Sequence, residues 1–462
     1  MAGLFGELAM ATRALTAQQM GLDATGQNIA NVNTPGYARR VVTMASVAAT
    51  SALEVGGGVT VQDVHAVRDR FLEARLLQVV PAEQRESAMA DVLSVAETSL
   101  GEAGSSIDAR LSELFSAFGR LADAPTSAVA RQEVQRAATA LTAAFGDVWA
   151  RLSDARTNAD QRVRGGIDEV NALAARLAEV NRSIGSAGAS QNTMHLRDQQ
   201  ASLVRQLSEL VDVHALDRGD GVLDITIGNG KPLVMGETAY AITAQSTPPS
   251  GYVALVSGGV DVTSQITGGR LGGFIAARDV TLPDYLSRLD TLAAAIVTEV
   301  NTAHAAGFDQ LGNAGGAFLS YSNAPTGVAG AARYMRLDPA IAADGRLIAA
   351  AGVAAAGDNT NALALARLGD ARIFDGNTAT FVDGWSRLVY RVGRDAQQAA
   401  DGRDSRADVV RQVDALRDQA SGVSLDEEAM MMLKYQRAYE ANARYFRVID
   451  EALDELFSAV GR

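Results

Sequence analysis

The sequence contains no cysteine, and this absence removes several classes of protein from consideration. Disulfide-stapled folds, thiol enzymes and thiolate metal sites all require cysteine. The absence fits an extracellular chain that folds without oxidation, but it fits a cytosolic chain equally well.

Basic charge is also scarce, because lysine occurs only at Lys231 and Lys434 and the formal net charge is -13. The 41 Lys and Arg residues stand among 54 Asp and Glu residues rather than in a basic stripe. Such a surface repels a phosphate backbone. We therefore expect no nucleic-acid partner.

Long apolar runs are missing as well. The Ala-rich stretch 340–357 is broken by Asp344, Gly345 and Arg346, so it is no candidate for a membrane span. The first residues lack the basic region, the apolar stretch and the cleavage site of a secretory signal. We expect no membrane insertion and, if the protein is exported, a route without a cleavable signal peptide.

Catalytic motifs are equally hard to find. The four histidines lie in separate segments without the HxH or HxxxH spacing of a metal site. The pair Gly230-Lys231 precedes Pro232 rather than the Ser or Thr of a P-loop, and 268–273 lacks the GxGxxG spacing. Acidic residues abound, but nothing selects a catalytic pair among them. We predict no catalytic residue, no metal and no cofactor, and hence no enzyme.

What the sequence does contain is a heptad pattern of apolar residues near its N-terminus. A 3.5-residue period keeps one seam of a helix facing a partner, as in coiled coils. The pattern stops at 31–36, where Pro35 and Gly36 predict a helix end and a turn. The seam consists of Leu4, Leu8, Leu15, Leu22 and Ile29.

A second heptad pattern occupies the C-terminal segment. Ser424 and Glu427 have the spacing of a capping box, and Asp426 lies in the first turn, where the helix dipole favours an acid. The seam consists of Leu425, Met432, Tyr439, Phe446, Leu453 and Val460. Each seam must bury against a long helical partner. The partner is either the other seam, in a simple intramolecular hairpin, or neighbouring subunits, which is the interpretation that we favour.

Polar residues interrupt both seams at Gln18, Thr25 and Gln436. Polar residues at such positions cost stability but set register in coiled coils. We hypothesise that role here; unchanged assembly after replacing Gln18 and Thr25 with leucine would count against it.

The patterns between the two seams predict a mainly α protein with a small β insertion. Residues 37–65 alternate like a hairpin, 66–212 are helical with turns near 101–106, 124–125 and 185–192, and 213–268 resemble a β module. Helical patterns return at 280–305, 362–368, 377–400 and 405–420, whereas 306–337 resembles a loop. We expect a coiled-coil domain from 1–36 and 424–462, an elongated helical body from 37–212 and 269–423, and an outer β-rich module at 213–268.

Two terminal motifs resemble the signatures shared by flagellar rod, hook and hook-associated axial proteins. One motif follows the N-terminal seam and the other begins the C-terminal seam, which is the order found in that group. The matching residues are Asn28, Asn31, Asn33, Pro35, Gly36 and Tyr37 at one end, and Ser424, Asp426, Glu427, Gln436, Tyr439 and Asn442 at the other.

The interior resembles the hook-associated protein 1 (FlgK) family in particular. The similar segments are Leu196-Arg197-Asp198-Gln199 and the stretch from Gly272-Gly273-Phe274 to Gly307-Phe308-Asp309. Larger members carry an additional β module after this region, whereas 310–340 is short here. We therefore expect a trimmed head.

The resemblance implies a structural junction protein between hook and filament, exported through the flagellar type III channel to the outside of the cell. It implies assembly as a ring of copies of this chain, contacts with the hook protein and a second junction protein, and an export chaperone on the C-terminal helix. The alternatives are another axial subunit, such as a hook or distal rod protein, and a wall hydrolase or protease on an axial frame.

Overall fold

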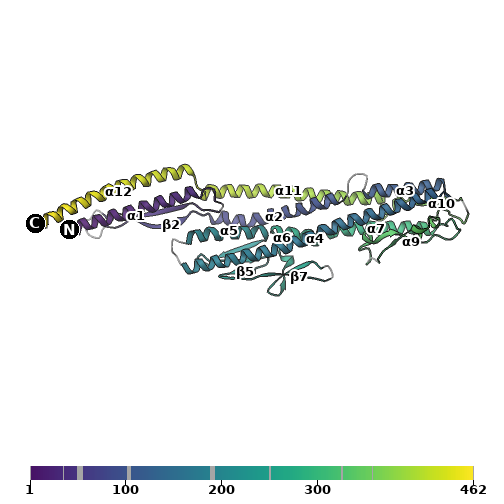
Figure 1. The fold of residues 1–462 in the computed structure, drawn as a ribbon, viewed down its shortest axis with the longest axis horizontal. Helices are drawn as coiled ribbons and strands as arrows, with labels where there is room; N and C mark the ends of the chain where they lie inside the picture. The colour runs from purple at the N-terminus through teal and green to yellow at the C-terminus, as the bar shows by residue number, and fades with distance from the viewer. Residues whose placement is uncertain are drawn as a thin grey trace.

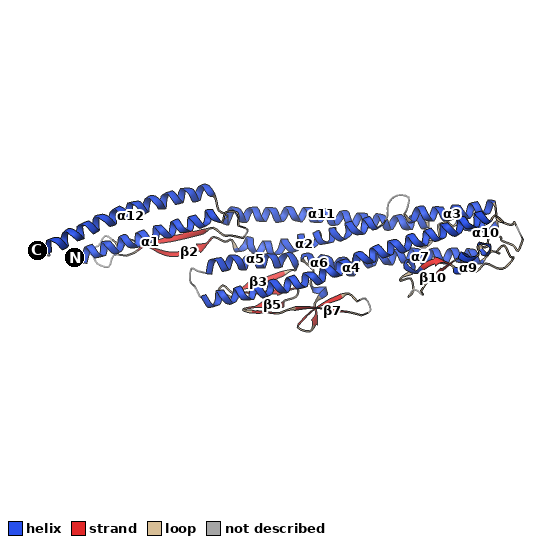
Figure 2. Cartoon of the chain, in the orientation of Figure 1, coloured by secondary structure: helices blue, strands red, loops and turns tan. Residues whose placement is uncertain are grey.

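The computed structural model describes residues 2–34, 36–48, 56–100, 106–187, 193–248, 251–323, 326–355 and 357–460. The chain forms an elongated molecule whose long helices run along one axis (Figures 1 and 2). The turns predicted at 101–106 and 185–192 fall largely outside the described residues, as does Pro35. The first helix ends at Ala30 and 31–34 form turns, so the helix end predicted at 31–36 is confirmed.

One end of the molecule is an arm made from both termini. It contains α1 (Ala2–Ala30), α12 (Leu425–Val460) and an antiparallel hairpin of β1 (Arg40–Ser46) and β2 (Val59–Ala66). The N- and C-termini lie together at its tip (Figure 1). The predicted hairpin is confirmed.

The body is organised around α4 (Ala128–Ala187), a helix of 60 residues and thus roughly 90 Å long. Its predicted heptad positions, from Val163 to Ile184, are buried, because they face the helices packed alongside. The other long body helices are α2 (Arg70–Ser99), α3 (Ile107–Asp123), α5 (Met194–Leu210), α7 (Leu282–Ala305) and α11 (Phe381–Ser421).

The prediction of two helices at 377–400 and 405–420 is wrong, because α11 runs unbroken through Gly402. A glycine inside a helix costs only about 1 kcal/mol, and packing along α2 outweighs that cost. A capping box between Thr380 and Asp383 begins the helix.

The predicted β module consists of two small antiparallel sheets beside α4. The first has the order β3-β4-β5-β6 and the second β7-β8-β9. The strands are β3 (Val213–Asp217), β4 (Leu223–Ile227), β5 (Lys231–Met235), β6 (Thr238–Ala239), β7 (Ile242–Ser246), β8 (Val253–Ser257) and β9 (Val260–Asp261).

A buried carboxylate fastens the second sheet to the body. Asp160 on α4 accepts from the Val253 N–H at 2.9 Å and from Arg278 at 2.6 Å. Burial alone would raise the pKa of Asp160, but these donors and Arg164 lower it below its ordinary value. Arg278 lies in a π-helical turn, Ala277–Thr281, that joins α6 (Gly269–Ala276) to α7.

The end of the body opposite the arm is more ordered than the predicted loop at 306–337. That segment contains β10 (Leu319–Tyr321), α8 (Ala331–Tyr334) and β11 (Met335–Leu337), followed by α9 (Pro339–Ala343) and α10 (Thr360–Arg367). Buried polar side chains of α7 hold its backbone: Asp290 accepts from the Gly330 and Ala332 N–H groups. Composition alone does not reveal such contacts. The predicted fold class, mainly α with a small β insertion, is confirmed.

His304 fixes the same region from within the core. The ring is fully buried; Nδ1 donates to the Gly316 carbonyl at 2.8 Å and Nε2 accepts from the Ala349 N–H at 2.9 Å. Burial lowers the pKa of His304, against the opposing effect of the Gly316 bond. The ring is therefore a structural group held in its neutral form.

We predict that protonation of His304 destabilises the fold. The folded state binds fewer protons than the unfolded state, so stability conferred by the neutral ring is lost as pH falls through the unfolded value of about 6.5. His304→Gln removes this part of the pH dependence and costs about 1–3 kcal/mol at pH 8. Denaturant unfolding between pH 8 and 5.5 measures both effects. The exposed His195→Gln control retains the wild-type slope, and an equal slope in His304→Gln would contradict the assignment.

Candidate assembly interface

The two helices of the arm run antiparallel, so each level of the arm pairs an early residue with a late one. At the tip, Ala11 packs with Ile449 and Leu453, and all three are buried. Leu4, Leu8 and Phe446 cover this cluster and are themselves partly exposed. The tip is therefore held by a small apolar contact within one chain.

At mid-arm the helices approach closely through a glycine. A Cβ added at Gly21 would lie 2.7 Å from the ring of Tyr435, so the ring occupies the space that any side chain would need. The nearby Thr25 is buried, but its hydroxyl donates to the Gly21 carbonyl of its own helix at 2.9 Å. The predicted polar seam residue thus makes no hydrogen bond across the described seam.

The base of the arm is a polar network centred on Asn28. Its amide nitrogen donates to Glu428 at 3.0 Å and to the Arg40 carbonyl at 2.9 Å. Its amide oxygen accepts from the Arg40 N–H and from the Tyr37 hydroxyl, each at 2.8 Å. One buried side chain therefore joins α1, the chain entering β1, and α12. We call Asn28, Tyr37, Arg39, Arg40 and Glu428 the basal network.

Charges complete this network. Glu428 is 2% exposed and accepts from Arg39 at 2.7 Å, while a second nitrogen of Arg39 lies 3.1 Å from Glu427. Burial raises the pKa of Tyr37, with Arg40 opposing it, so its hydroxyl remains a donor. These partners stabilise the buried Glu428 carboxylate. Loss of one of them would destabilise the fold, because a buried charge without its full set of partners costs free energy.

A second carboxylate ties the arm to the body. Asp198, near the start of α5, pairs with Arg68 and lies 3.6 Å from Arg40. The Arg39 N–H also donates to the Ser421 carbonyl, at the end of α11, at 3.1 Å. The orientation of the arm is thus set by contacts on both sides of its base.

Some of the predicted seam residues contact the other helix of the arm, whereas others are exposed to solvent. Within the chain, Phe446 and Leu453 face α1, but Leu425 is 51% and Tyr439 37% exposed, so the early heptad positions of α12 do not face α1. Leu4 and Leu8 contact the tip cluster. Met432, Leu15, Leu22 and Ile29 are half-buried, and the Val460 side chain lies outside the described part.

The physical reason is helix geometry. A straight helix drifts by about 20° per heptad, so a strict heptad series rotates away from its partner unless the helices supercoil. The positions that α12 turns toward α1 near its start are instead Glu428 and Tyr435. Neither residue was among the predicted seam positions, since the predicted series began at Leu425 and these two residues belong to a different heptad series, one that begins with a carboxylate.

The motif residues play unequal parts. Asn28 and Tyr37 belong to the basal network, and Glu427 pairs with its Arg39. Asn33 is exposed, and Asn31 and Asn442 bond to carbonyls one turn back in the chain. The predicted capping box at Ser424 is only half formed: the Glu427 N–H lies 3.5 Å from its hydroxyl, while the Glu427 carboxylate turns to Arg39. Gly36 adopts a φ of 81°, which favours glycine. Asp426, Gln436 and Tyr439 are exposed.

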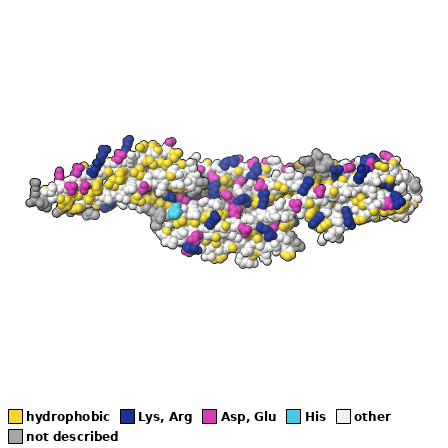
Figure 3. Space-filling view, viewed as in Figure 1, with side chains coloured by type: hydrophobic (Ala, Val, Ile, Leu, Met, Phe, Trp, Pro, Cys, Tyr) yellow, Lys and Arg dark blue, Asp and Glu magenta, His cyan; other side chains and the backbone are white. Residues whose placement is uncertain are grey.

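Apolar side chains also gather on the outside of the arm. Figure 3 shows hydrophobic groups along the arm, in contrast to the more mixed surface of the body. On α12, Met430 is 64%, Leu433 56% and Val448 62% exposed. Contiguous exposed apolar side chains of this kind mark interaction surfaces.

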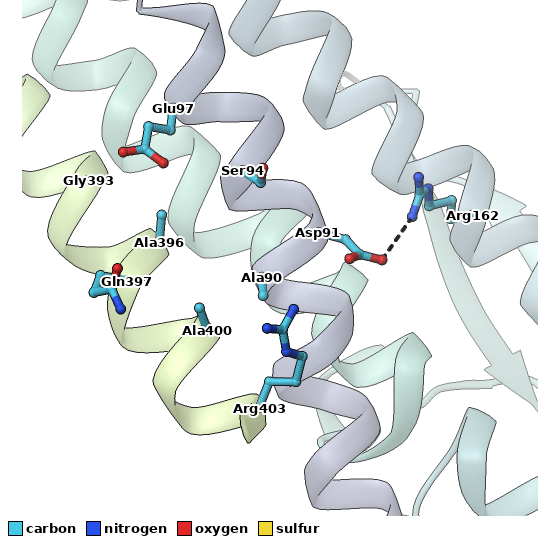
Figure 4. Close-up of a pocket in the computed structure, with 10 residues that line it drawn as sticks. All are labelled: Ala90, Asp91, Ser94, Glu97, Arg162, Gly393, Ala396, Gln397, Ala400 and Arg403. Carbon is cyan, nitrogen blue, oxygen red and sulfur yellow. Dashed lines mark ion pairs between the residues drawn. The ribbon is translucent and has the colours of Figure 1, made fainter. Parts of the chain in front are cut away.

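Elsewhere the surface offers little that resembles reaction chemistry. A groove between α2 and α11 is lined largely by small side chains, and its Asp91 lies 3.8 Å from Arg162 (Figure 4). Its other cation, Arg403, pairs with Asp404. Within the described ranges, no group of three His, Asp or Glu side chains could hold a metal ion, and no helix is long and apolar enough to cross a bilayer.

Comparisons with known proteins decide the family. A model of the flagellar hook-associated protein FlgK helical domain matches residues 93–319. Models of flagellar basal body rod proteins match residues 8–37, and the C-terminal model of the rod FlgEFG proteins matches 417–459. This chain belongs to the flagellar hook-associated protein 1 (FlgK) family. It is a structural protein of the flagellum and not an enzyme, which the sequence predicted.

Similar proteins span the whole chain. Flagellar hook-associated protein 1 of Bacillus subtilis is 28% identical over 100% of this chain and 99% of its own length. That of Salmonella typhimurium is 25% identical over 96% and 98%. The flagellar hook junction protein FlgK of Burkholderia pseudomallei shares the fold, with a TM-score of 0.66 and 16% identity over 75% of this chain and 100% of that one.

We predict that Asn28→Ala loosens the base of the arm and leaves the body intact. The change removes one of the two printed partners of Glu428, which keeps Arg39, and the two bonds from Asn28 to the Arg40 backbone, at a cost of about 1–3 kcal/mol. Trypsin should then cleave after Lys434 and Arg437 several-fold faster, as identified by mass spectrometry. Asn31→Ala, which removes only local bonds to the Gln27 carbonyl and the Thr34 hydroxyl, is the matched control. Equal cleavage of the two variants would refute the role of Asn28.

A second prediction concerns the contact at Gly21. Both Gly21→Leu and Gly26→Leu gain up to about 1 kcal/mol of helix propensity. A side chain at position 21 collides with Tyr435, whereas a Cβ at position 26 meets no described atom within 4 Å. We expect Gly21→Leu to lower the unfolding temperature of the arm, and Gly26→Leu to leave it unchanged or raise it, by circular dichroism. The same shift in both variants would be the contrary result.

Proposed function

We propose that this protein joins the flagellar hook to the filament, and that the arm is the device by which it assembles. The observation that carries this proposal is the combination of a rigidly based arm with an uncovered apolar outer face. Burying apolar surface contributes about 25 cal/mol per Å². Neighbouring subunits would therefore cover Leu433 and Val448 at a considerable gain, and the chain alone leaves them in water.

The finer parts of the proposal follow from the resemblance of the sequence to the family. The chain forms a ring of copies, with the hook protein on one side and a second junction protein on the other. An export chaperone covers α12 in the cytoplasm before export through the flagellar channel, without a cleavable signal peptide. The exposed Met430 and Phe457 support such a cover, because free apolar surface invites aggregation.

We further propose three functional parts. The axial part comprises 1–36 and 424–462, the body 37–212 and 269–423, and the β module 213–268 faces outward. The predicted assembly residues, from Leu4 to Ile29 and from Leu425 to Val460, lie in the axial part. Their half-exposed members are available to neighbours, and the buried members hold the arm together.

A strain without the gene tests the proposal. We expect hooks without filaments, and flagellin released into the medium, as seen by electron microscopy and immunoblotting. Restoring the full chain should restore filaments. Loss of the hooks themselves would favour the alternative of a hook or rod subunit. If a chain lacking both 1–36 and 424–462 still occupied the junction, the role of the arm would be wrong.

A further inference from the structure

The arm and the body of the molecule are joined by few connections. Only two segments of the chain pass between them, 67–69 from β2 to α2 and 422–424 from α11 to α12. Among the described residues, no helix or strand of the arm packs extensively against a helix of the body. The tip cluster of the arm is also separate from the apolar core of the body. The joint therefore lacks the large apolar interface that fixes one domain rigidly to another.

The contacts that do cross the joint are polar. The Arg39 N–H donates to the Ser421 carbonyl at 3.1 Å. On α5, the Asp198 carboxylate pairs with Arg68 in the first connecting segment and lies 3.6 Å from Arg40 in β1. Among the described residues, the contact between Asp198 and Arg40 is the only ion pair that links a strand or helix of the arm to a helix of the body.

The charges at this contact are partly withdrawn from water. The side chains of Asp198 and Arg40 are each 16% exposed, and that of Arg68 is 19% exposed. Solvent and salt screen such a pair much less than a pair on the open surface. Asp198 therefore attracts both cations more strongly than an exposed carboxylate would.

Arg40 is nevertheless held incompletely. Its distance of 3.6 Å from Asp198 is longer than a hydrogen bond, and its Nε is buried without a hydrogen-bond partner among the described residues. A buried donor without a partner costs free energy. A movement that exposes the Arg40 guanidinium would return this donor to water, so the contact opposes its own closure in part.

The two connecting segments have the features of a hinge. Each is three residues long and lies between the end of one element and the start of the next, where hinge residues commonly lie. The second segment begins with Gly422, and a Cβ at this position would lie 2.2 Å from the Asp418 carbonyl oxygen. Glycine also allows the widest range of backbone angles.

We propose that Asp198 is an electrostatic latch that holds the arm at its angle to the body, and that the arm pivots about 67–69 and 422–424 when this latch opens. The arm turns as one unit, because the tip cluster, the contact at Gly21 and the basal network all lie within it. Asp198 is thus a positioning residue that acts through Arg40 and Arg68. The inference goes beyond the proposed function, since it concerns a motion of the free chain.

A disulfide across the joint measures how often the latch is closed, because the natural chain has no cysteine. A Cβ at Gly36 would lie 3.9 Å from the Cβ of Ser202 on α5, which is within disulfide range. The purified Gly36→Cys/Ser202→Cys chain is oxidised under fixed conditions, and bond formation is followed on gels. We expect Asp198→Asn to slow it several-fold. Loss of an anion would by itself favour the thiolate and speed the reaction, so slowing reports the pivot.

The matched control is Asp414→Asn in the same double-cysteine chain. It also removes one carboxylate that pairs with an arginine of α5, because Asp414 lies 2.8 Å from Arg205, but both of these partners belong to the body. We expect the control to form the disulfide at the parent rate. If Asp198→Asn reacts as fast as the parent, or if the control is slowed equally, the latch is wrong.

Distances between spin labels provide a second measurement on the purified chain. Labels at Asp23→Cys on α1 and Ala172→Cys on α4, both at exposed positions, report the distance from arm to body. Labels at Asp23→Cys and Lys434→Cys report the arm alone. With Asp198→Asn, pulsed electron paramagnetic resonance should show a broader first distribution and an unchanged second one. An unchanged first distribution would exclude the pivot. Broadening of both would show an arm that unfolds rather than turns, which also overturns the inference.

These outcomes are separable from those of the proposed function. A chain whose arm does not respond to Asp198→Asn loses the latch but keeps the junction role. Filaments in a strain that lacks the gene remove the junction role and leave the latch intact.

Discussion

The hydrogen bond between Asn28 and Glu428 closes the chain, since the two residues are 400 positions apart in sequence. Around it the Tyr37 hydroxyl, the Arg40 backbone and the Arg39 guanidinium satisfy the remaining polar groups. A buried carboxylate tolerates few other arrangements, because an unpaired charge in this position would cost several kcal/mol. The basal network therefore determines how α12 packs against α1, and this packing sets the direction of the arm.

Because the base of the arm is fixed, the arm has an inner side and an outer side that differ in their contacts. The inner side is closed by the tip cluster, by the ring of Tyr435 over Gly21, and by the basal network. The outer side keeps apolar and charged groups that the chain does not satisfy. The body behaves differently, because its core is continuous and α11 pairs its arginines internally. The exposed apolar side chains of α12 thus lie in a part of the chain that a family model of rod proteins also matches.

The sequence predicted the large features well, because their signals are periodic. Apolar residues from Val163 to Ile184 recur with a helical period, and the structure buries them along α4. The hairpin and the β module were predictable from alternation and from turn residues such as Gly228-Asn229-Gly230, which joins β4 to β5. Local patterns of this kind require no knowledge of distant parts of the chain.

What the sequence did not reveal depends on contacts between distant residues. In the sequence, Glu428 resembles an ordinary acidic residue in the first turn of a helix. Only the structure shows that it contacts Asn28 and Arg39. The segment 306–337 resembles a loop by composition, but Asp290 and His304 hold the surrounding backbone. The rotation of the heptad positions away from their partner helix was not predictable either. Which positions face the partner depends on the partner's surface and not on the heptad series alone.

Hydrogen exchange on the purified chain, compared with the chain in isolated hook-filament assemblies, tests the central claim most directly. If the outer face of the arm is completed by neighbours, amides in 2–30 and 425–460 exchange more slowly after assembly than in the free chain. Those of α4 are protected in both. Equal protection of the arm in the two states would contradict the claim.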